Sequence, residues 1–419
     1  WRTQALLPAL LAVFVHNQWS RSLLYYTCEF GLSANDPAAA RQLMNVELGF
    51  GTEAYGFLAA IPFTLVFAPL SLLAGGAADA SNRARLTWLS LLGWSAATAW
   101  QGSARSIEEV AASRALQGLC QAFTTPAAFT LLADATPQAR RGTVNSAYST
   151  GVYIGGGLAA LSILLDRAVG WRSTLHVSAA VGVLLAAAVA VSIEDMREEA
   201  RAAELVPERA PAKPRLDVRA LARSQMASLG RTWQAVAERP AVQLLLASCA
   251  LRFCAGFAIA VWVGPWGREA FPDRQTDFGL TKAAISALGG GFSAIAGGVL
   301  SDILGERDAS RRLYLPVAGS LGAAVCWGMM MDAQSFEWAM GWLLLQYLFA
   351  ECWFGAAIAT LQGQLPKEVQ GGAQGAFSTL TVFGNLAPLL IGQASQHMPL
   401  ADVLHATVPA LYLGSAAAF

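Results

Sequence analysis

Charged side chains inside apolar segments are the residues of this 419-residue chain most able to do chemistry. Arg21, Arg252 and Glu351 each stand well within such a segment, and Gln121 has a similar place. Charges at this depth are costly and usually mark a functional site. Guanidinium groups outnumber carboxylates here, and they bind phosphate or carboxylate through paired N–H donors. The residue types therefore predict a buried site for an anionic head group.

Arg114 is a further intramembrane charge, and Gln117 follows it by one helical turn. Two interpretations are open. Arg114 either contributes to the same site or holds neighbouring helices together by binding backbone carbonyl groups. We expect the structural role for Arg114 and Gln117, and a functional role for Arg21 and Glu351.

The elements that position these residues are membrane-spanning helices. Of the residues, 55% are hydrophobic and only 13% are charged, which is typical of a protein that lies in lipid. About twelve runs approach the roughly 20 apolar residues of a spanning helix, and none alternates as a barrel strand would. The sequence predicts an all-α membrane protein with helices near 6–30, 55–74, 86–104, 110–133, 144–165, 175–193, 242–266, 283–303, 313–331, 338–361, 375–393 and 404–419.

The loop charges predict an orientation. Basic residues gather on one side, at Arg83, Arg85, Arg140, Arg141, Arg307, Arg311, Arg312 and Lys367. Acidic residues gather on the other, at Glu108, Glu109, Asp273, Asp277, Asp332, Glu337 and Asp402. By the positive-inside rule, the basic side, both termini and the central linker face the cytoplasm or its equivalent. Four arginines on the acidic side make the bias moderate: Arg41, Arg105, Arg268 and Arg274.

One long polar segment divides the apolar runs into two sets of six. We expect an N-terminal six-helix bundle over residues 1–193, a linker over 194–240 and a C-terminal six-helix bundle over 241–419. Apolar residues at helical spacing over 218–236, interleaved with arginines, predict an amphipathic helix on the inner membrane surface. Residues 195–215 have the composition of a tether.

A five-residue motif that begins with glycine and ends with aspartate occurs at the end of two apolar runs, and arginines follow both copies. We expect both aspartates to cap a gate on the basic, inner side of the membrane. They would do so by accepting hydrogen bonds from helix N-termini or from arginines. The candidate gating residues are Gly75, Asp79, Arg83, Arg85, Gly298 and Asp302.

Other landmarks repeat at nearly the same spacing. Arg21 and Arg252 are 231 positions apart, and Gln121 and Glu351 are 230 apart. The two motif aspartates are 223 apart, as expected if the loop after the first run is longer in the first half. Parallel halves with a binding site between them near the midplane are a transporter architecture.

Three segments together resemble signature motifs of the major facilitator superfamily. They are Gly75-x-x-x-Asp79-x-x-x-Arg83-x-Arg85, the segment Arg114-x-x-Gln117-Gly118 and the glycine-rich stretch 151–157. The resemblance implies two pseudo-symmetric six-helix bundles around a central cavity. Ala80 replaces a basic residue of the first motif, and the glycine-rich stretch lacks its proline. These departures concern gating and leave the implied fold unchanged.

Within the superfamily, the chain is most similar to the spinster-like branch, whose members export sphingolipids or lysophospholipids. The similarity rests on Asn17-x-x-Ser20-Arg21, on residues 114–122, and on Phe349-Ala-Glu351 followed by Pro366 and Gly371. It implies a substrate-binding and coupling set made of Asn17, Ser20, Arg21, Gln121, Arg252 and Glu351.

Proton coupling is where the chain departs from that branch. Ser20 and Gln121 occupy the places of an aspartate and a glutamate that the resemblance implies are proton sites. Neither side chain changes charge at physiological pH. We therefore expect a uniporter, or a carrier driven through Glu351 alone. If Glu351 lies opposite Arg21 or Arg252, its protonation breaks an ion pair and frees an arginine for an anionic substrate.

Two functions remain open. The first is an alternating-access transporter, uncoupled or weakly proton-coupled, for an anionic or amphiphilic small molecule such as a lysophospholipid or organic anion. The second is a transport-deficient relative that serves as a structural or sensing subunit of a membrane complex. The missing carboxylates favour the second, whereas Arg21, Glu351 and the doubled aspartate motif favour the first. We expect the carrier.

The sequence gives no sign of an enzyme. No nucleophile motif, phosphate loop or nucleic-acid patch occurs, and the six cysteines lie in apolar runs without metal-ligand spacing. We expect no metal and no cofactor. The expected partners are membrane lipid, a small-molecule or lipid substrate and, under the second reading, a membrane complex. We expect an integral multi-pass protein of the plasma membrane or an organelle, with an N-terminal segment preceding Trp1.

Overall fold

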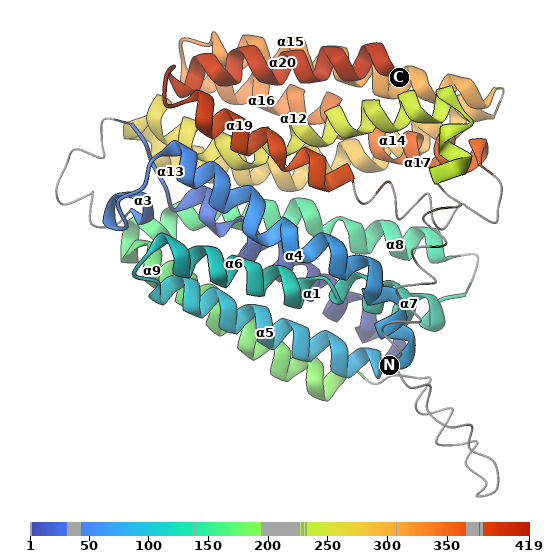
Figure 1. The fold of residues 1–419 in the computed structure, drawn as a ribbon, viewed down its shortest axis with the longest axis horizontal. Coiled ribbons are helices and arrows are strands. Elements are labelled where there is room, and N and C mark those ends of the chain that lie inside the picture. Colours follow the sequence, from blue (N-terminus) through green and yellow to red (C-terminus); the bar gives the residue numbers. More distant parts are fainter. Residues whose placement is uncertain are drawn as a thin grey trace, which may run out of the picture. The chain divides into compact units, whose positions relative to one another are not determined.

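The computed structural model describes residues 2–31, 43–137, 140–193, 227, 230, 233–306, 308–365, 377 and 380–419. Helices make up nearly all of these residues, and no strand occurs among them (Figure 1). Before the linker the helices are α1 (Arg2–Ser22), η1 (Leu23–Tyr26), α3 (Met44–Glu47), α4 (Thr52–Ala80), α5 (Arg83–Ser103), α6 (Ile107–Gln121), α7 (Thr124–Ala135), α8 (Arg141–Ser149) and α9 (Gly151–Ser192).

The second half of the chain is equally helical. Its elements are α12 (Pro240–Ala270), η4 (Pro272–Arg274), α13 (Gln275–Ala284), η5 (Ile285–Gly290), α14 (Gly291–Gly305), η6 (Ala309–Leu313), α15 (Tyr314–Met331), α16 (Phe336–Ala350), α17 (Trp353–Gln364), α19 (Leu386–Ala394) and α20 (Leu400–Ala418). Short polar sequences start several of them. The side chains of Asn82, Ser106 and Ser335 each accept a backbone N–H of the first turn, at α5, α6 and α16.

Six of the described helices are long and apolar enough to cross a membrane. They are Thr52–Ser71, Ala147–Ser192, Pro240–Ala270, Pro272–Gly305, Ser310–Met331 and Phe336–Leu361. Shorter apolar helices accompany them, among them Leu380–Ala394. The expectation of an all-α membrane protein is therefore confirmed.

Several predicted runs are joined or broken in the structure. The fifth and sixth runs, 144–165 and 175–193, contribute to two helices that share the label α9 and are separated by a kink at Gly170, where φ is 78° and ψ is 164°. The fourth and tenth runs are each two helices. One breaks between α6 and α7, directly after Gln121, and the other breaks at Glu351, between α16 and α17. Gln121 and Glu351 thus both stand at helix breaks.

The chain packs as two compact units, and we describe each by itself. Unit 1 contains the described residues of Trp1–Arg21, Pro62–Gly155 and Arg172–Gln225. In it α5 packs against α6 and α7. Its core includes Leu10, Val13, Leu91, Trp94, Leu131 and Tyr148, all nearly inaccessible to solvent.

Unit 2 contains the described residues of Ser22–Ile61, Gly156–Trp171 and Met226–Phe419. In it α15 packs against α16 and α20, and α12 against α20 and α19. Unit 2 includes parts of the first half of the chain: η1, α3, the beginning of α4 and the middle of α9. The division expected from the sequence, 1–193, 194–240 and 241–419, stays a prediction.

Most of the predicted linker and inner-surface helix lies outside the described residues. A helix is described over residues 233–237, where Trp233 is exposed and Val236 is buried with Val242 of α12.

Candidate functional site

Arg252 lies in the middle of α12 within unit 2, and only 4% of its surface is exposed. Its Nη2 donates a hydrogen bond to the carbonyl oxygen of Ala350. The guanidinium carbon lies 4.6 Å from the ring centre of Tyr412 and 5.3 Å from that of Trp353. Among the described residues, Nε and Nη1 have no hydrogen-bond partner. Arg252 is therefore a cation between two aromatic rings with two donors left for an acceptor.

The break before α17 explains the contact to Ala350. Ala350 is the last residue of α16, and the last carbonyl groups of a helix have no partner within it. Arg252 supplies one. Glu351 follows directly and is partly exposed, so the sequence-predicted pair Arg252 and Glu351 lies at one helix break. No metal-ligand cluster occurs among the described residues.

Aromatic side chains surround this arginine. Trp353 and Phe253 lie 5.3 Å apart between ring centres, and Phe377 lies 5.5 Å from Phe253. Tyr412 is held by a hydrogen bond of 2.8 Å from Gln346 Nε2 to its hydroxyl oxygen. Trp353 and Phe377 are buried in the core of unit 2, and Phe253 is half-buried beside them. Sequence reasoning did not single out the rings, because aromatic residues in apolar runs are usually core.

A second polar group lies in unit 1. Gln121 Nε2 donates to the backbone oxygen of Asn17 and to Ser20 Oγ, at 3.3 Å each. Ser20 Oγ donates to the same Asn17 oxygen at 3.1 Å. All three side chains are buried. The structure therefore brings Asn17, Ser20 and Gln121 together as a neutral hydrogen-bonded set.

Arg21 and Arg114 stand beside this set. The guanidinium carbon of Arg21 lies 4.4 Å from the ring centre of Phe63. Arg114 Nη1 donates to the backbone oxygen of Arg21 at 3.2 Å, and Gln117 Nε2 donates to Thr98 Oγ1 at 3.3 Å. Both predicted structural residues thus bond within unit 1. Arg252 and Glu351 belong to unit 2.

The candidate gating residues are described in part. Arg83 is buried, and its Nη1 lies 2.7 Å from Oδ2 of Asp134, a residue that sequence reasoning missed. The surroundings of Gly75 and the side chain of Asp79 lie outside the part of the chain that can be described. Arg85 donates its backbone N–H to Asn82. The assignment of arginine partners to Asp79 therefore stays a prediction.

The second copy of the motif ends α14. Asp302 is exposed, and its backbone oxygen accepts the N–H of Glu306. A side chain at Gly305 would meet the Arg312 guanidinium, the flexible end of a partly exposed side chain that can move aside. In the following loop, the Ser310 backbone N–H donates to Asp308 at 2.9 Å and holds the pKa of that carboxyl below its usual value.

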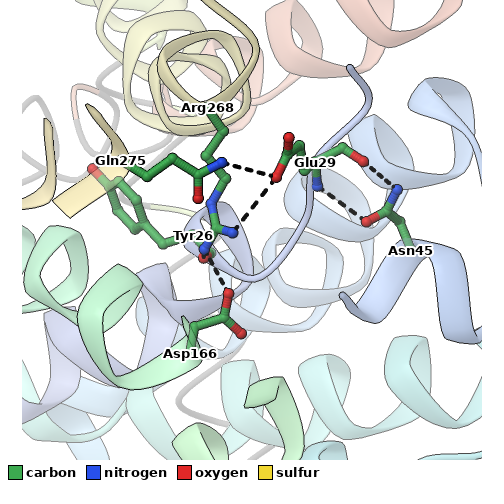
Figure 2. A network of polar contacts seen from close by, with 6 residues as sticks. All are labelled: Tyr26, Glu29, Asn45, Asp166, Arg268 and Gln275. Carbon is green, nitrogen blue, oxygen red and sulfur yellow. Dashed lines mark hydrogen bonds and ion pairs between the residues drawn. The ribbon is translucent and has the colours of Figure 1, made fainter. Parts of the chain in front are cut away.

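A charged cluster that sequence reasoning missed lies at the end of α12 remote from the linker, which we call the far side (Figure 2). Arg268 Nη2 lies 2.6 Å from Oδ2 of Asp166, and Nη1 lies 3.9 Å from Oε2 of Glu29. Arg268 also donates to the backbone oxygen of Tyr26. All three charged side chains are nearly inaccessible. We call Tyr26, Glu29, Asn45, Asp166, Arg268 and Gln275 the Arg268 cluster.

One sequence signal could have found it. Glu29 falls inside the first predicted run, and Arg268 is an arginine on the side where the positive-inside rule disfavours arginine. A charge that departs from that rule next to a helix end indicates a specific partner. Asp166, 102 positions away, carried no signal of its own.

This fold and these buried charges define a membrane transporter. The family model of the Major Facilitator Superfamily matches residues 22–388. The chain belongs to that superfamily, so it is a non-enzymatic, integral multi-pass transporter, as the sequence predicted.

Curated relatives are named for efflux and resistance. The chain is 22% identical over 374 residues to an MFS-type efflux pump of Mycolicibacterium smegmatis, covering 86% of this chain and 80% of the relative. It is 35% identical over 127 residues to the puromycin resistance protein pur8 of Streptomyces alboniger, covering 29% and 25% of the two chains.

Solved structures share the fold. A bacterial homologue of the human lysosomal transporter Spinster, in its inward-facing and unoccupied conformation, superposes with a TM-score of 0.74. The match covers 100% of this chain and 94% of that one at 16% identity. The D323A mutant of the nucleoside transporter NupG gives 0.66 over 99% and 100% of the two chains, at 12% identity. The expected resemblance in fold is confirmed.

Proposed function

We propose that this chain is an alternating-access secondary transporter for an anionic or amphiphilic small molecule, such as a lysophospholipid or an organic anion, working as a uniporter or with weak proton coupling. The observation that carries the proposal is Arg252, whose Nε and Nη1 are buried without a hydrogen-bond partner among the described residues. Leaving buried donors unsatisfied costs about 1–3 kcal/mol each, and more for a charged group. An anionic ligand would remove that cost.

The surroundings of Arg252 support an amphiphilic ligand. The indole of Trp353 lies beside the guanidinium, and the half-buried ring of Phe253 packs against that indole. A molecule with an anionic head and an apolar body satisfies both features at once.

The relatives support export of small organic or lipid-like molecules. One is named as an efflux pump, one as a puromycin resistance protein, and one structure belongs to a homologue of Spinster. We carry over from these names only the broad substrate class, because identity is low wherever the match is long.

A binding experiment with matched lipids tests the proposal. Purified protein in detergent would be titrated with oleoyl lysophosphatidate and with monoolein, which share an acyl chain and differ in charge. We expect the lysophosphatidate to raise the melting temperature more. That difference should vanish in Arg252→Gln and persist in part in Arg252→Lys, which keeps the charge and one donor for Ala350.

Arg274→Gln is the matched control, because Arg274 is an exposed arginine of the same unit, paired with Asp277 and Glu337. It should bind both lipids as the wild type does. Equal stabilisation of the wild type by the charged and uncharged lipid would contradict the proposed anion site. Equal loss in Arg252→Gln and Arg274→Gln would contradict the assignment to Arg252.

A further inference from the structure

The Arg268 cluster buries more negative than positive charge. Among the described residues, Arg268 is the one cation that forms an ion pair with Asp166 or Glu29, whose side chains are 2% and 4% exposed. With both carboxylates ionised the cluster has a net charge of −1. An uncompensated carboxylate away from water is strongly unfavourable, and such a group is usually neutralised by a proton or a bound cation.

The distances identify which carboxylate is left over. Asp166 lies 2.6 Å from Arg268, within hydrogen-bonding range, whereas Glu29 lies 3.9 Å away. Glu29 Oε2 accepts a longer bond of 3.3 Å from the Gln275 amide, and its Oε1 has no partner among the described residues. Asp166 Oδ1 also has no hydrogen-bond partner among the described residues, so the distances to Arg268 decide between the two carboxylates. Asp166 is the ion-pair partner, and Glu29 is the carboxylate left to take a proton.

The backbone fixes Glu29 in this place. Its N–H donates to Asn45 Oδ1 at 3.0 Å, and its carbonyl accepts from Asn45 Nδ2 at 2.6 Å (Figure 2). These two hydrogen bonds hold the Glu29 backbone against Asn45 of α3.

Neighbouring titratable groups do not neutralise the cluster. Glu269 on α12 is exposed and packs against Gly31, where it adds negative charge. The Cys28 thiol is buried next to Glu29. On α3, Glu47 accepts a bond from Trp171. On α13, the buried Lys282 donates to the Tyr347 hydroxyl at 2.8 Å and also interacts with the Tyr26 hydroxyl of the cluster, but it forms no ion pair with Glu29 or Asp166 among the described residues.

The cluster is assembled from both halves of the chain. Glu29 and Tyr26 follow α1, Asp166 lies on α9, and Arg268 and Gln275 belong to the second half. Another hydrogen bond in unit 2 also joins segments from the two halves of the chain. Tyr55 of α4 donates to the Val261 oxygen at 2.6 Å. Separating the halves on the far side would expose Glu29 to water and remove the need for a proton.

We propose that Glu29 is a proton-binding site that exists only while the far side of the carrier is closed. This inference rests on the proposed function only in taking the closed cluster as one state of a transport cycle. Closure takes a proton from the far-side solution, and opening returns it there. The site therefore sets the balance between closed and open far side according to pH, without carrying a proton across the membrane.

The sign follows from linkage. The closed state binds the proton more tightly than the open state, so acid favours closure and rising pH favours opening, by up to about tenfold in the equilibrium per pH unit. Glu29→Gln imitates the protonated carboxyl, so its closure should not depend on pH. Asp166→Asn leaves one carboxylate for Arg268 and removes the excess charge, so it should lose the pH dependence too.

Hydrogen–deuterium exchange of the full chain in nanodiscs tests the proposal without any substrate. The readout is protection of the peptide spanning residues 23–31, which contains the Glu29 N–H, corrected for chemical exchange at each pH. Between pH 5.5 and 8.5 we expect protection in the wild type to fall as pH rises. Glu29→Gln should stay protected throughout, and Arg274→Gln, which breaks an exposed pair, should follow the wild type.

Two outcomes would overturn the proposal. One is wild-type protection that does not change with pH, or the same change in Glu29→Gln. The other is protection that follows sodium instead of pH when sodium replaces choline, which would make the ligand a metal cation. A failure of transport with the exchange pattern intact would count against the proposed function and leave the proton site standing.

Discussion

Arg21 and Arg252 are 231 positions apart, yet their guanidinium groups have similar surroundings. Each lies over an aromatic ring, at 4.4 Å from Phe63 and 4.6 Å from Tyr412. A cation over a ring face gains on the order of 1 kcal/mol, and more when it is desolvated. The rings stabilise the charges without occupying the plane of the guanidinium, in which Arg252 donates to the oxygen of Ala350.

The neutral set in unit 1 gives a direct test of the missing proton carrier. Gln121 donates to the Asn17 oxygen, and a carboxylate in its place cannot donate unless it is protonated. In Gln121→Glu we therefore expect a carboxyl that is neutral in the folded protein and ionises on unfolding. Above the ordinary Glu pKa of about 4.3, stability should fall with pH by up to about 1.4 kcal/mol per unit.

Thermal unfolding between pH 5 and 8 would measure this effect. Gln334→Glu, at an exposed amide, is the control and should match the wild type across the range. A Gln121→Glu variant whose stability, relative to wild type, stays constant with pH would mean that the new carboxylate finds a donor or water.

Asp134 provides a second test at this scale. Its carboxylate is 28% exposed, but its partner Arg83 is buried, so Asp134→Asn removes the counter-charge of a buried guanidinium. We expect a loss of about 2–4 kcal/mol in the free energy of unfolding. Arg274→Gln breaks a pair with exposed partners and should cost under about 1 kcal/mol. Equal losses measured by denaturant or thermal unfolding would show that burial does not decide the cost.

At the scale of elements, helix breaks place the candidate residues. Pro126 has no N–H to bond the carbonyl of Ala122 four residues earlier, which explains why α6 and α7 separate after Gln121. No proline follows Glu351 closely. There the carbonyl of Ala350 is bonded by Arg252 from another helix, so the break depends on tertiary structure.

The turn within α9 depends on the backbone conformation of a single residue. Gly170, with φ 78° and ψ 164°, occupies a backbone region that is nearly confined to glycine. Gly170→Ala should lower the free energy of unfolding by about 1–3 kcal/mol. Gly256→Ala is the control, because its new methyl group meets nothing within 4 Å in the middle of α12. It should be neutral or stabilising by up to about 1 kcal/mol. Indistinguishable melting temperatures for the two variants would contradict this account.

How far the sequence predicts these elements depends on the range of the interactions. Apolar run length predicted the helices, because a span is a local requirement of the bilayer. The motif residues and the offset between Gln121 and Glu351 indicated the family. Hydropathy could not show that the two helices of α9 meet at a kink at Gly170. It also could not pair Arg268 with Asp166, because such a pairing needs the folded positions of both helices.

At the scale of the whole molecule, a transporter needs a ligand site and a gate that responds to it. In unit 2 the proposed ligand site, Arg252 in the middle of α12, and the proposed gate, the Arg268 cluster at its end, are separate features. Both face segments that are distant in sequence. Substrate binding and far-side closure can therefore be altered independently, by substitution of Arg252 or of Glu29.

The proposed coupling belongs to this scale as well. Ser20 and Gln121 hold no proton, and Glu29 exchanges its proton with one side only. Glu351 is then the remaining candidate among the residues predicted from the sequence for driving transport with a pH gradient. A carrier without that drive would equilibrate its substrate but not concentrate it.

The most direct test of the central claim, a carrier with its anion site at Arg252, is uptake into liposomes. Uptake of a fluorescent lysophospholipid and of an organic anion would be measured with and without a pH gradient, for the wild type, Arg252→Gln, Glu351→Gln and Arg274→Gln. We expect wild-type and Arg274→Gln transport, a loss of about tenfold or more in Arg252→Gln, and no gradient-driven accumulation in Glu351→Gln. Undiminished transport by Arg252→Gln, or no transport of any anion by folded wild-type protein, would contradict the claim, and the latter result would favour a structural subunit.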